Sequence, residues 1–491
     1  MSERETAATG GSPDTGRVVL VAAVAAIGGF LFGFDTAVIN GAVGAVQSHF
    51  HAGAFVLGLA VSAALLGSAL GAFTAGRLAD RFGRVPTMVV AAILFLVQSF
   101  GVAFSFTIVD FSAWRFVGGV AVGVASVIAP AYIAESAPAG LRGRLGSFQQ
   151  LAIVTGIFIA LLSDYAIAAA AGGAAQKWLL GQPAWRWMFA TESIPSLIYL
   201  VGALQIPESP RYLVSIDRLR EARDVLARIV GQAGVEAKIR EIRLTLSTER
   251  RPRLSDLRGR LGLLPVVWVG VGLSVFQQLV GINVIFYYSS VLWQAVGFSE
   301  SQSLQITVIT GLTNIVTTLV AIATIDRFGR RPLLLIGSAG MIVTLGMLAF
   351  LFGTAPIDAH GQPHLQGTTG PVALLAANVY VFFFGMSWGP VVWVLLGEMF
   401  PNRIRAAALG VSAAMQWIAN FAVSTSFPEL KNAGLGYAYG LYTLAAILSL
   451  LFVFALVPET RGRELEAMEE GVGRRRRPAP PAPAASEREF E

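Results

Sequence analysis

Two ionisable side chains lie inside long apolar stretches of the sequence. Asp35 falls well within the stretch 18–40, and Arg115 lies near one end of the stretch 112–134. An ionisable group in a lipid bilayer is costly and usually faces a cavity or a partner. Paired with each other, Arg115 would hold Asp35 ionised, and protonation of Asp35 would release the pair. A fixed structural ion pair is the alternative that the residues alone leave open.

Three amide side chains lie close together in another apolar stretch, 262–292. Gln277, Gln278 and Asn283 fall within two helical turns of one another. An amide both donates and accepts hydrogen bonds, which suits a ligand rich in hydroxyl groups. Amides also hold neighbouring membrane helices together, and the residues alone do not decide between a binding site and such a structural contact.

Charged groups gather directly after several apolar stretches. The segments 80–84 and 326–331 each combine a glycine with clustered guanidinium groups, and Glu135 and Glu398 end neighbouring stretches. Arginine pairs with a carboxylate through two parallel hydrogen bonds and stays charged. These groups could form a latch, in addition to marking one side of a membrane and capping helices.

The overall composition indicates that a membrane surrounds these groups. Of the 491 residues, 55% are hydrophobic and only 13% are charged, and the mean hydropathy is +0.65, whereas soluble chains carry about 25% charge. The absence of cysteine excludes disulfides, thiolate nucleophiles and Cys-ligated zinc. The net charge of +6 comes from basic residues that alternate with apolar stretches. We therefore expect no nucleic-acid partner, and we expect neither a metal nor a cofactor.

An enzyme is disfavoured by the setting of the Gly-x-Ser-x-Gly motif at 385–389. That motif needs a strand, a turn and a helix around its serine, whereas here it lies within an apolar stretch. The side chains that could serve as a base are expected in loops away from it: His49, His51, His360 and His364. The last two are four residues apart and could bind a metal only weakly.

Twelve stretches are long and apolar enough to cross a membrane as helices, since about 20 residues are needed. They are 18–40, 55–78, 86–108, 112–134, 146–169, 185–206, 262–292, 303–325, 332–354, 371–397, 406–428 and 436–457. Arginines gather in the loops after the second, fourth, eighth and tenth of them, and cytoplasmic loops are enriched in such residues. An even number of spans then places both termini in the cytoplasm. The long polar insert 207–261 is expected to form a small helical domain on the same side.

Three motifs repeat in the same order along the chain, which indicates an internal duplication. The segment 80–84 returns at 326–330 after 246 residues, and Glu135 with Arg142 returns as Glu398 with Arg405 after 263. The segment 207–209 returns at 458–460, with threonine for serine, after 251 residues. We therefore expect two parallel six-helix halves, the layout of major facilitator transporters. The expected boundaries are 17–206 and 262–460 for the halves, 207–261 for the linker domain, and 1–16 and 461–491 for disordered cytoplasmic tails.

Five further short motifs carry a family resemblance. They are GFDT at 33–36, RFVGG at 115–119, PESPRYL at 207–213, QQLVGIN at 277–283 and GPVVW at 389–393. Together with the repeats they resemble the sugar porter family of the major facilitator superfamily, from about Gly28 to Glu464. The details are similar to the bacterial proton-linked xylose and glucose carriers and the animal facilitative glucose carriers. The resemblance implies an all-α protein with twelve transmembrane helices that carries a sugar across the cell membrane by alternating access.

The resemblance also implies roles for individual residues. Proton-coupled members of the family typically carry Asp at the position of Asp35, whereas facilitative carriers carry Asn, so the resemblance implies proton symport through Asp35 and Arg115. The family's sugar contacts fall on Gln150, Gln277, Gln278, Asn283, Asn314, Trp393, Gln416 and Trp417. An aromatic ring such as that of Trp393 or Phe32 could stack on a pyranose. The cytoplasmic gate would comprise Arg81, Arg84, Glu135, Arg142, Glu208, Arg327, Arg330, Arg331, Glu398 and Arg405.

The identity of the sugar depends on few positions. Ile157 and Phe286 match the glucose-carrier pattern, where the xylose-type carriers have Gln and Leu, so the resemblance favours D-glucose or a similar hexose over D-xylose. The row of amides, without a second buried acid or a deep cation, favours a neutral polyol. We expect a monomer whose partners are a monosaccharide, a proton and the lipid bilayer. A facilitative sugar uniporter and a polyol or drug transporter of the same fold are the alternatives.

Overall fold

The computed structural model describes residues 15–136, 142–248, 254–259, 262–356, 364–401 and 404–460. Within these ranges the chain forms nineteen α-helices, three short 3-10 helices and one two-stranded sheet. This confirms the expected all-α class. The expected tails 1–16 and 461–491 lie almost entirely outside the described residues, because the first helix begins at Thr15.

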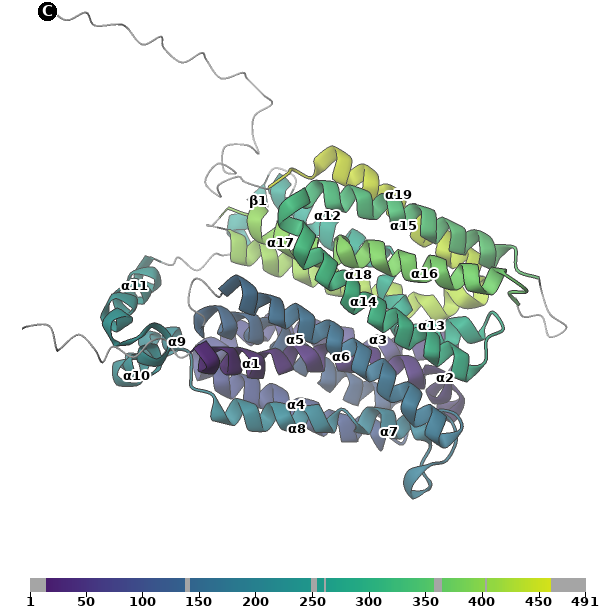
Figure 1. The fold of residues 1–491 in the computed structure, drawn as a ribbon, viewed down its shortest axis with the longest axis horizontal. Coiled ribbons are helices and arrows are strands. Elements are labelled where there is room, and N and C mark those ends of the chain that lie inside the picture. Colours follow the sequence, from purple (N-terminus) through teal and green to yellow (C-terminus); the bar gives the residue numbers. More distant parts are fainter. Residues whose placement is uncertain are drawn as a thin grey trace, which may run out of the picture.

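The two halves of the chain form two helical bundles that lie side by side (Figure 1). The first comprises α1 (Thr15–Ala37), α2 (Ile39–Phe50), α3 (Ala54–Phe82), α4 (Arg84–Ala103), α5 (Ile108–Ser136), α6 (Arg142–Ala171), η1 (Leu179–Gly181), α7 (Ala184–Ala190) and α8 (Ser193–Gln205). The second comprises α12 (Pro265–Leu279), α13 (Ile282–Gln294), α14 (Glu300–Phe328), α15 (Arg330–Gly353), α16 (Thr369–Met386), α17 (Trp388–Met399), α18 (Arg405–Ala433) and α19 (Leu435–Leu456).

A small linker domain connects the bundles. It comprises α9 (Pro210–Ser215), α10 (Leu219–Val230), η2 (Gln232–Gly234), α11 (Val235–Thr248), η3 (Leu254–Leu257), β1 (Arg258–Gly259) and β2 (Gly262–Leu263). Its helices α9–α11 lie beyond one end of the first bundle, and β1 lies beside the second (Figure 1). The two strands pair antiparallel, so the linker contains a short strand at 258–259 besides the helices that the sequence led us to expect. We call the end of the molecule at which α9–α11 lie the linker end, and the other end the opposite end.

Twelve segments of the described residues are long and apolar enough to cross a membrane, as expected from the sequence. Four of them, at 18–50, 184–205, 265–294 and 369–399, each consist of two successive helices. The first span was expected to end at 40, but the chain turns at Val38 and continues as α2 to Phe50. His49, expected in a loop, therefore lies in the last turn of α2.

One of these breaks falls at a corresponding place in the two halves, whereas the other two lie in the sixth span of the first half and the fourth span of the second half. The first span of each half is interrupted, at Val38 in the first half and at Val280 and Gly281 in the second. Gly281 has φ +81°, and a Cβ there would lie 2.7 Å from the ring of Tyr442. A larger residue would therefore be strained in its backbone conformation and would also collide with that ring. Discontinuous helices at membrane depth commonly border a binding site in transporters.

The halves pack against each other at the opposite end. One apolar core contains buried residues of both halves there, among them Val46 of α2 and Ile285 of α13. The buried members of a second core, around Met88 and Ile128, all belong to the first half and lie toward the linker end. The shared core therefore joins the bundles at one end of the molecule.

Hydrogen bonds across the halves reinforce this contact. Asn40 of α2 is fully buried and donates to the Phe286 carbonyl at 3.0 Å and to Ser289 Oγ at 3.1 Å. Its Oδ1 accepts from the Ser290 backbone N–H at 3.0 Å. Two further bonds across the halves join Ser62 to Thr425 at 2.6 Å and Gln305 to Tyr165 at 2.9 Å.

Candidate functional site

A buried ion pair lies near the end of α1, just before the break that leads to α2. Arg115 of α5 donates through Nη1 to Asp35 Oδ1 at 2.7 Å and to the Asp35 carbonyl at 3.1 Å. The exposed fraction of the side chain is 2% for Arg115 and 0% for Asp35. The two ionisable residues that the sequence led us to pair are thus in direct contact.

Two further polar side chains, which the sequence analysis did not single out, complete this group. Gln98 of α4 donates through Nε2 to Asp35 Oδ1 at 3.2 Å and to Glu192 Oε2 at 2.7 Å. Gln98 and Glu192 are both fully buried, and Glu192 lies directly before α8. We call Asp35, Gln98, Arg115 and Glu192 the carboxylate cluster.

The carboxylate cluster contains two acids beside one cation. Leaving a charge buried without a partner costs several kcal/mol, so charge balance in this cluster favours one bound proton. One oxygen of each acid, Asp35 Oδ2 and Glu192 Oε1, has no hydrogen-bond partner among the described residues. The cluster can therefore hold a proton that exchanges between two carboxyl groups linked by one amide.

One tyrosine of the second half lies near the carboxylate cluster. Tyr287 of α13 lies within electrostatic range of both Asp35 and Arg115. The hydroxyl of Tyr287 accepts a hydrogen bond from Asn420 of α18 at 3.4 Å.

The three amides expected to act together form one hydrogen-bonded chain. Asn283 donates to Gln278 Oε1 at 2.6 Å, and Gln278 donates to Gln277 Oε1 at 3.5 Å. Gln277 in turn donates to the backbone carbonyls of Trp388 and Gly389, at 2.7 and 3.1 Å. We call Gln277, Gln278 and Asn283 the amide chain. It joins the α12–α13 break to the start of α17, and ligand hydroxyl groups could replace each of its bonds.

Other residues expected to contact a sugar meet across the two halves. The rings of Phe32 in α1 and Trp417 in α18 have centroids 6.1 Å apart. Next to Trp417, the Oε1 atom of Gln416 is buried without a hydrogen-bond partner among the described residues. A buried acceptor without a partner is costly, so Gln416 is suited to accept a hydrogen bond from a ligand.

The remaining expected sugar contacts are spread over three helices and the opposite end. Gln150 and Ile157 are half-buried on α6, Asn314 is half-buried on α14, and Trp393 on α17 is 43% exposed. Phe286 is buried, and its carbonyl is held by α2, so it belongs to the contact between the halves. Within the described part of the chain, no side-chain hydrogen bond joins these residues to the amide chain.

At the linker end of the first half, an arginine ties three helix ends together. Arg84 donates through Nε and Nη2 to the two carboxylate oxygens of Glu135, both at 2.9 Å. Glu208 accepts from the backbone N–H groups of Arg84 and Val85 at 3.0 and 3.1 Å. Glu208 thereby caps the first turn of α4, where a negative charge is favourable.

The second half repeats this arrangement atom for atom. Arg330 donates to the two oxygens of Glu398 at 3.0 and 2.7 Å. Glu459 accepts from the backbone N–H groups of Arg330 and Arg331 at 3.1 and 3.0 Å. The duplication inferred from sequence motifs is thus visible as duplicated contacts.

These pairs do not form the expected latch between the halves in this structure. Each of the ion pairs of Arg84 and Arg330 joins helix ends within one half. Of the other expected gate residues, Arg81 and Arg327 are exposed. Arg331 donates to the Phe454 carbonyl, and Arg405 donates to the Phe400 carbonyl. The side chain of Arg142 lies outside the described residues. A role in opening and closing stays a prediction.

The expectation that no second acid would be buried is wrong. Glu192 and Asp164 are both fully buried. Each lies in a stretch that was expected to span the membrane, so the argument that singled out Asp35 could have found both. Neither has a described contact with the amide chain, so the amide chain itself remains an uncharged site.

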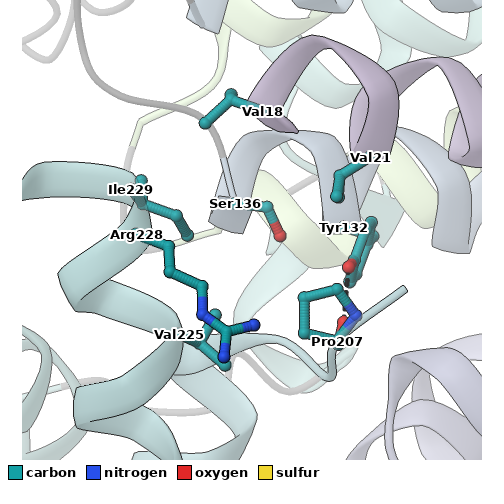
Figure 2. A pocket seen from close by; sticks show the side chains of 8 residues that line it. All are labelled: Val18, Val21, Tyr132, Ser136, Pro207, Val225, Arg228 and Ile229. Carbon is teal, nitrogen blue, oxygen red and sulfur yellow. Dashed lines mark hydrogen bonds between the residues drawn. The ribbon is translucent and has the colours of Figure 1, made fainter. Parts of the chain in front are cut away.

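A small cavity lies at the linker end between the first half and α10 (Figure 2). Its lining residues are Val18, Val21, Tyr132, Ser136, Pro207, Val225, Arg228 and Ile229. The hydroxyl of Tyr132 donates to the Pro207 carbonyl, and Ser136 Oγ has no partner among the described residues. Its volume of about 20 Å³ suits a single water molecule, so this cavity is not a site for a larger ligand.

Comparisons with known proteins agree with this architecture. The model of the family described as "Sugar (and other) transporter" matches residues 21–471. The chain is 62% identical to a glucose transport protein of Synechocystis over 92% of this chain and 97% of that protein. It is 39% identical to the D-xylose-proton symporter of Escherichia coli over 91% of this chain and 94% of that protein.

Solved structures show the same fold. The inward open conformation of the xylose transporter XylE from E. coli matches with a TM-score of 0.79 and 37% identity, covering 92% of this chain and 99% of that chain. The proton:xylose symporter XylE bound to 6-bromo-6-deoxy-D-glucose matches with a TM-score of 0.74 and 38% identity, covering 93% of this chain and 99% of that chain. The chain therefore belongs to the sugar transporter family of the major facilitator superfamily, a family of multi-pass membrane transporters and not of enzymes.

Proposed function

We propose that this protein imports a monosaccharide together with a proton, by alternating access, and that the sugar is D-glucose or a similar hexose. The names of the relatives support this substrate class, since they include a glucose transport protein and a D-xylose-proton symporter. The observation that carries the proposal is the carboxylate cluster, because a facilitative carrier has no need of two buried acids beside one arginine. The protein works as a monomer, since each chain contains both halves and the site between them.

The carboxylate cluster gives a mechanism for the coupling. In the observed state Arg115 is bonded to Asp35 and not to Glu192, which makes Glu192 the acid that holds the proton. A further proton on Asp35 would weaken its bond to Arg115, since that bond depends on the carboxylate charge. Freed from Asp35, Arg115 changes the field at Tyr287 and hence at α13. Proton binding at Asp35 thereby biases the same helix that begins at the sugar site.

The amide chain is the centre of the proposed sugar site. Its three amides, with Gln416 and the rings of Phe32 and Trp417, offer hydrogen bonds and an apolar face from both halves. A sugar bound there would take hydrogen bonds that Gln277 now gives to the start of α17. Ile157 on α6, and Phe286 from within the contact between the halves, would be the apolar neighbours of a hexose hydroxymethyl group.

The orientation follows from the arginines at the linker end. Both bundles place arginine clusters at that end, and cytoplasmic loops are enriched in arginine. The linker end then faces the cytoplasm, both termini are cytoplasmic, and the opposite end faces outside. The contacts between the halves at the opposite end make this an inward-facing state, in line with the TM-score of 0.79 to the inward open structure.

Topology can be tested by labelling, because the chain has no cysteine. Ser48 near the opposite end and Ser215 in the linker domain are both exposed serines. In intact cells, Ser48→Cys should react with an impermeant thiol reagent, while Ser215→Cys should react only after the cells are opened. The reverse labelling pattern would show that the proposed orientation is wrong.

Transport itself can be tested in cells that lack their own sugar carriers. Cells that express this chain should accumulate labelled glucose against a gradient, and a protonophore should abolish the accumulation. Asp35→Asn should lose accumulation but retain exchange of internal for external sugar. Glucose uptake that a protonophore does not change would favour a facilitative uniporter, and xylose uptake that excess glucose fails to inhibit would contradict the hexose assignment.

A further inference from the structure

A third buried acid lies outside the carboxylate cluster. Asp164 of α6 is fully buried, and its Oδ2 accepts a hydrogen bond from the backbone N–H of Gly41 at 3.1 Å. Its Oδ1 has no hydrogen-bond partner among the described residues. The contact is close, since a Cβ at position 41 would lie 2.7 Å from Asp164 Oδ2. Glycine at position 41 is therefore what allows the carboxyl group to reach the backbone of α2.

Asp164 lies between two of the contacts that join the halves at the opposite end. Asp164 is bonded to Gly41, and the residue directly before Gly41 is Asn40, which is bonded to α13. The residue after Asp164, Tyr165, accepts a hydrogen bond from Gln305 of α14. When the halves separate at this end, both flanking contacts break and water can reach the Asp164 carboxyl group. The burial of Asp164 is thus tied to closure of the opposite end.

No cation compensates Asp164 in the described structure. The elements packed against α6 are α1, α2, α5, α7 and α14. The charged or titratable groups toward this end on those elements are Asp35, His49, Asp110, Arg115, Arg186 and Glu300. Asp35 and Arg115 are bonded to each other, and Arg186 donates to the Ala103 and Ser105 carbonyls and contacts His49. Asp110 and Glu300 accept from backbone N–H groups of Phe106 and Ala174.

A carboxyl group buried with one hydrogen bond and no cation favours its neutral, protonated form. Exposed to water, the same group is ionised at neutral pH. We propose that Asp164 is a proton-binding positioning residue of the outer gate, which takes up a proton from outside as the gate closes and returns it outside when the gate opens. External acidity then favours closure. This inference rests on the orientation given under the proposed function.

This proton differs from the one that drives transport. Asp164 lies seven residues before the end of α6 at Ala171, about 10 Å from that end along the helix. Its side chain lies against α2 of its own half, beside the contacts that join the halves, and becomes accessible with the outer gate, so its proton does not cross the membrane. Asp164 therefore sets how pH moves the gate equilibrium, whereas the carboxylate cluster sets the coupling to the sugar.

The experiment measures gate opening directly and does not require sugar transport. Gly44 lies on α2 opposite Val291, with 3.8 Å between an added Cβ and that residue, so Gly44→Cys places a thiol between the halves. The rate of its reaction with an impermeant maleimide is measured in intact cells at external pH 5.5 to 8.5. All variants carry Asp35→Asn, which removes the titrating acid proposed for coupling.

Maleimides react with the thiolate, whose fraction itself rises with pH, so each labelling rate is divided by that of the exposed Ser48→Cys in the same background and at the same pH. With Asp164 present, this ratio should rise about tenfold for each pH unit in the range where the open state ionises, as for one linked proton. Asp164→Asn should abolish this rise, and Asp164→Glu should restore a pH dependence, which a purely structural role for Asp164 would not produce. Asp110→Asn is the control that should leave the rise intact, since the Asp110 carboxylate accepts from the Phe106 N–H within the first half. Equal pH dependence with and without Asp164 would overturn the proposal. So would a lack of pH dependence in the protein that carries only Gly44→Cys and Asp35→Asn. Reversed labelling of Ser48→Cys and Ser215→Cys would instead overturn the orientation.

Discussion

Gln98 links the two buried acids of the carboxylate cluster, Asp35 and Glu192, through hydrogen bonds. Its single amide nitrogen donates to both Asp35 and Glu192, and an amide can do so whichever of the two carries the proton. A glycine makes room for it, since a Cβ at Gly118 would lie 2.7 Å from Gln98 Cδ. The motif that contains Arg115 and Gly118 therefore positions both the cation and the bridge of the carboxylate cluster.

We expect Gln98→Leu to uncouple the two acids. Leucine removes both hydrogen bonds, and each buried acceptor left without a partner costs about 1 to 3 kcal/mol. Proton-driven accumulation of sugar should fall at least about tenfold, as such a cost implies, while sugar exchange persists. The control is Ser99→Ala, since Ser99 is also buried but bonds only within its own helix. Unchanged accumulation in Gln98→Leu would contradict the bridging role.

The amide chain leads to a second prediction, about affinity. Gln277→Ala removes a ligand group and also the bonds to the Trp388 and Gly389 carbonyls. At about 1 to 3 kcal/mol for a lost buried partner, sugar binding should weaken roughly ten- to a hundredfold, measured by calorimetry on the purified protein. Gln47→Ala, near the end of α2, should bind normally. Equal affinities for the two variants would remove Gln277 from the site.

Individual residues show how far sequence reasoning reaches. Asp35 and Arg115 could be found because charges inside apolar stretches stand out, and Gln277 because three amides lie in one short segment. Glu192 and Asp164 carried the same signal and were missed. Gln98 carried no signal, because a single glutamine in an apolar stretch gains its meaning only from the two acids that folding brings to it.

At the scale of elements, glycine determines how closely α3 and α5 pack. A Cβ at Gly119 would lie 1.9 Å from the Ala64 carbonyl oxygen, and one at Gly123 would lie 2.2 Å from that of Ser68. On the facing helix, a Cβ at Gly67 would lie 2.1 Å from the Phe116 carbonyl oxygen. Small residues on both helices thus allow backbone contact, as is common between membrane helices.

We expect Gly119→Ala to destabilise the first half. The added methyl group collides with backbone that cannot move aside, and overpacking of this kind costs about 1 to 3 kcal/mol. The purified protein should unfold at a lower temperature than the wild type. Gly76→Ala in α3 is the control, because nothing lies within 4 Å of its Cβ position and alanine favours a helix. A melting temperature of Gly119→Ala at or above that of Gly76→Ala would argue against the close packing.

The elements were predictable in number but not in their interruptions. Apolar length identifies a span, yet the turns at Val38 and Gly281 leave the average hydropathy unchanged. The extension of the first span to Phe50 follows from packing of α2 against α13, which no local pattern encodes. The paired strands at 258–259 and 262–263 are likewise too short to give an alternating strand pattern.

At the scale of the whole molecule, the duplication was predictable and the conformation was not. The repeated motifs became two matching clusters, Arg84 with Glu135 and Arg330 with Glu398. Which end of the molecule is closed depends instead on pairs between the halves, such as Asn40 with Ser290. Such pairs leave no repeat in the sequence, and a transporter forms and breaks them in every cycle. The same chain therefore encodes both the closed and the open state of the opposite end.

The last prediction concerns this equilibrium. Asn40 uses both its amide nitrogen and its oxygen on α13, so Asn40→Ala should weaken the closed state by about 1 to 3 kcal/mol. The outer gate would then be open more often, and labelling of Gly44→Cys should speed up roughly ten- to a hundredfold. Asn378→Ala is the control, because Asn378 bonds only within the second half and its loss should leave labelling unchanged. Equal labelling rates for the two variants would mean that the gate is held by the apolar contact between the halves and not by Asn40.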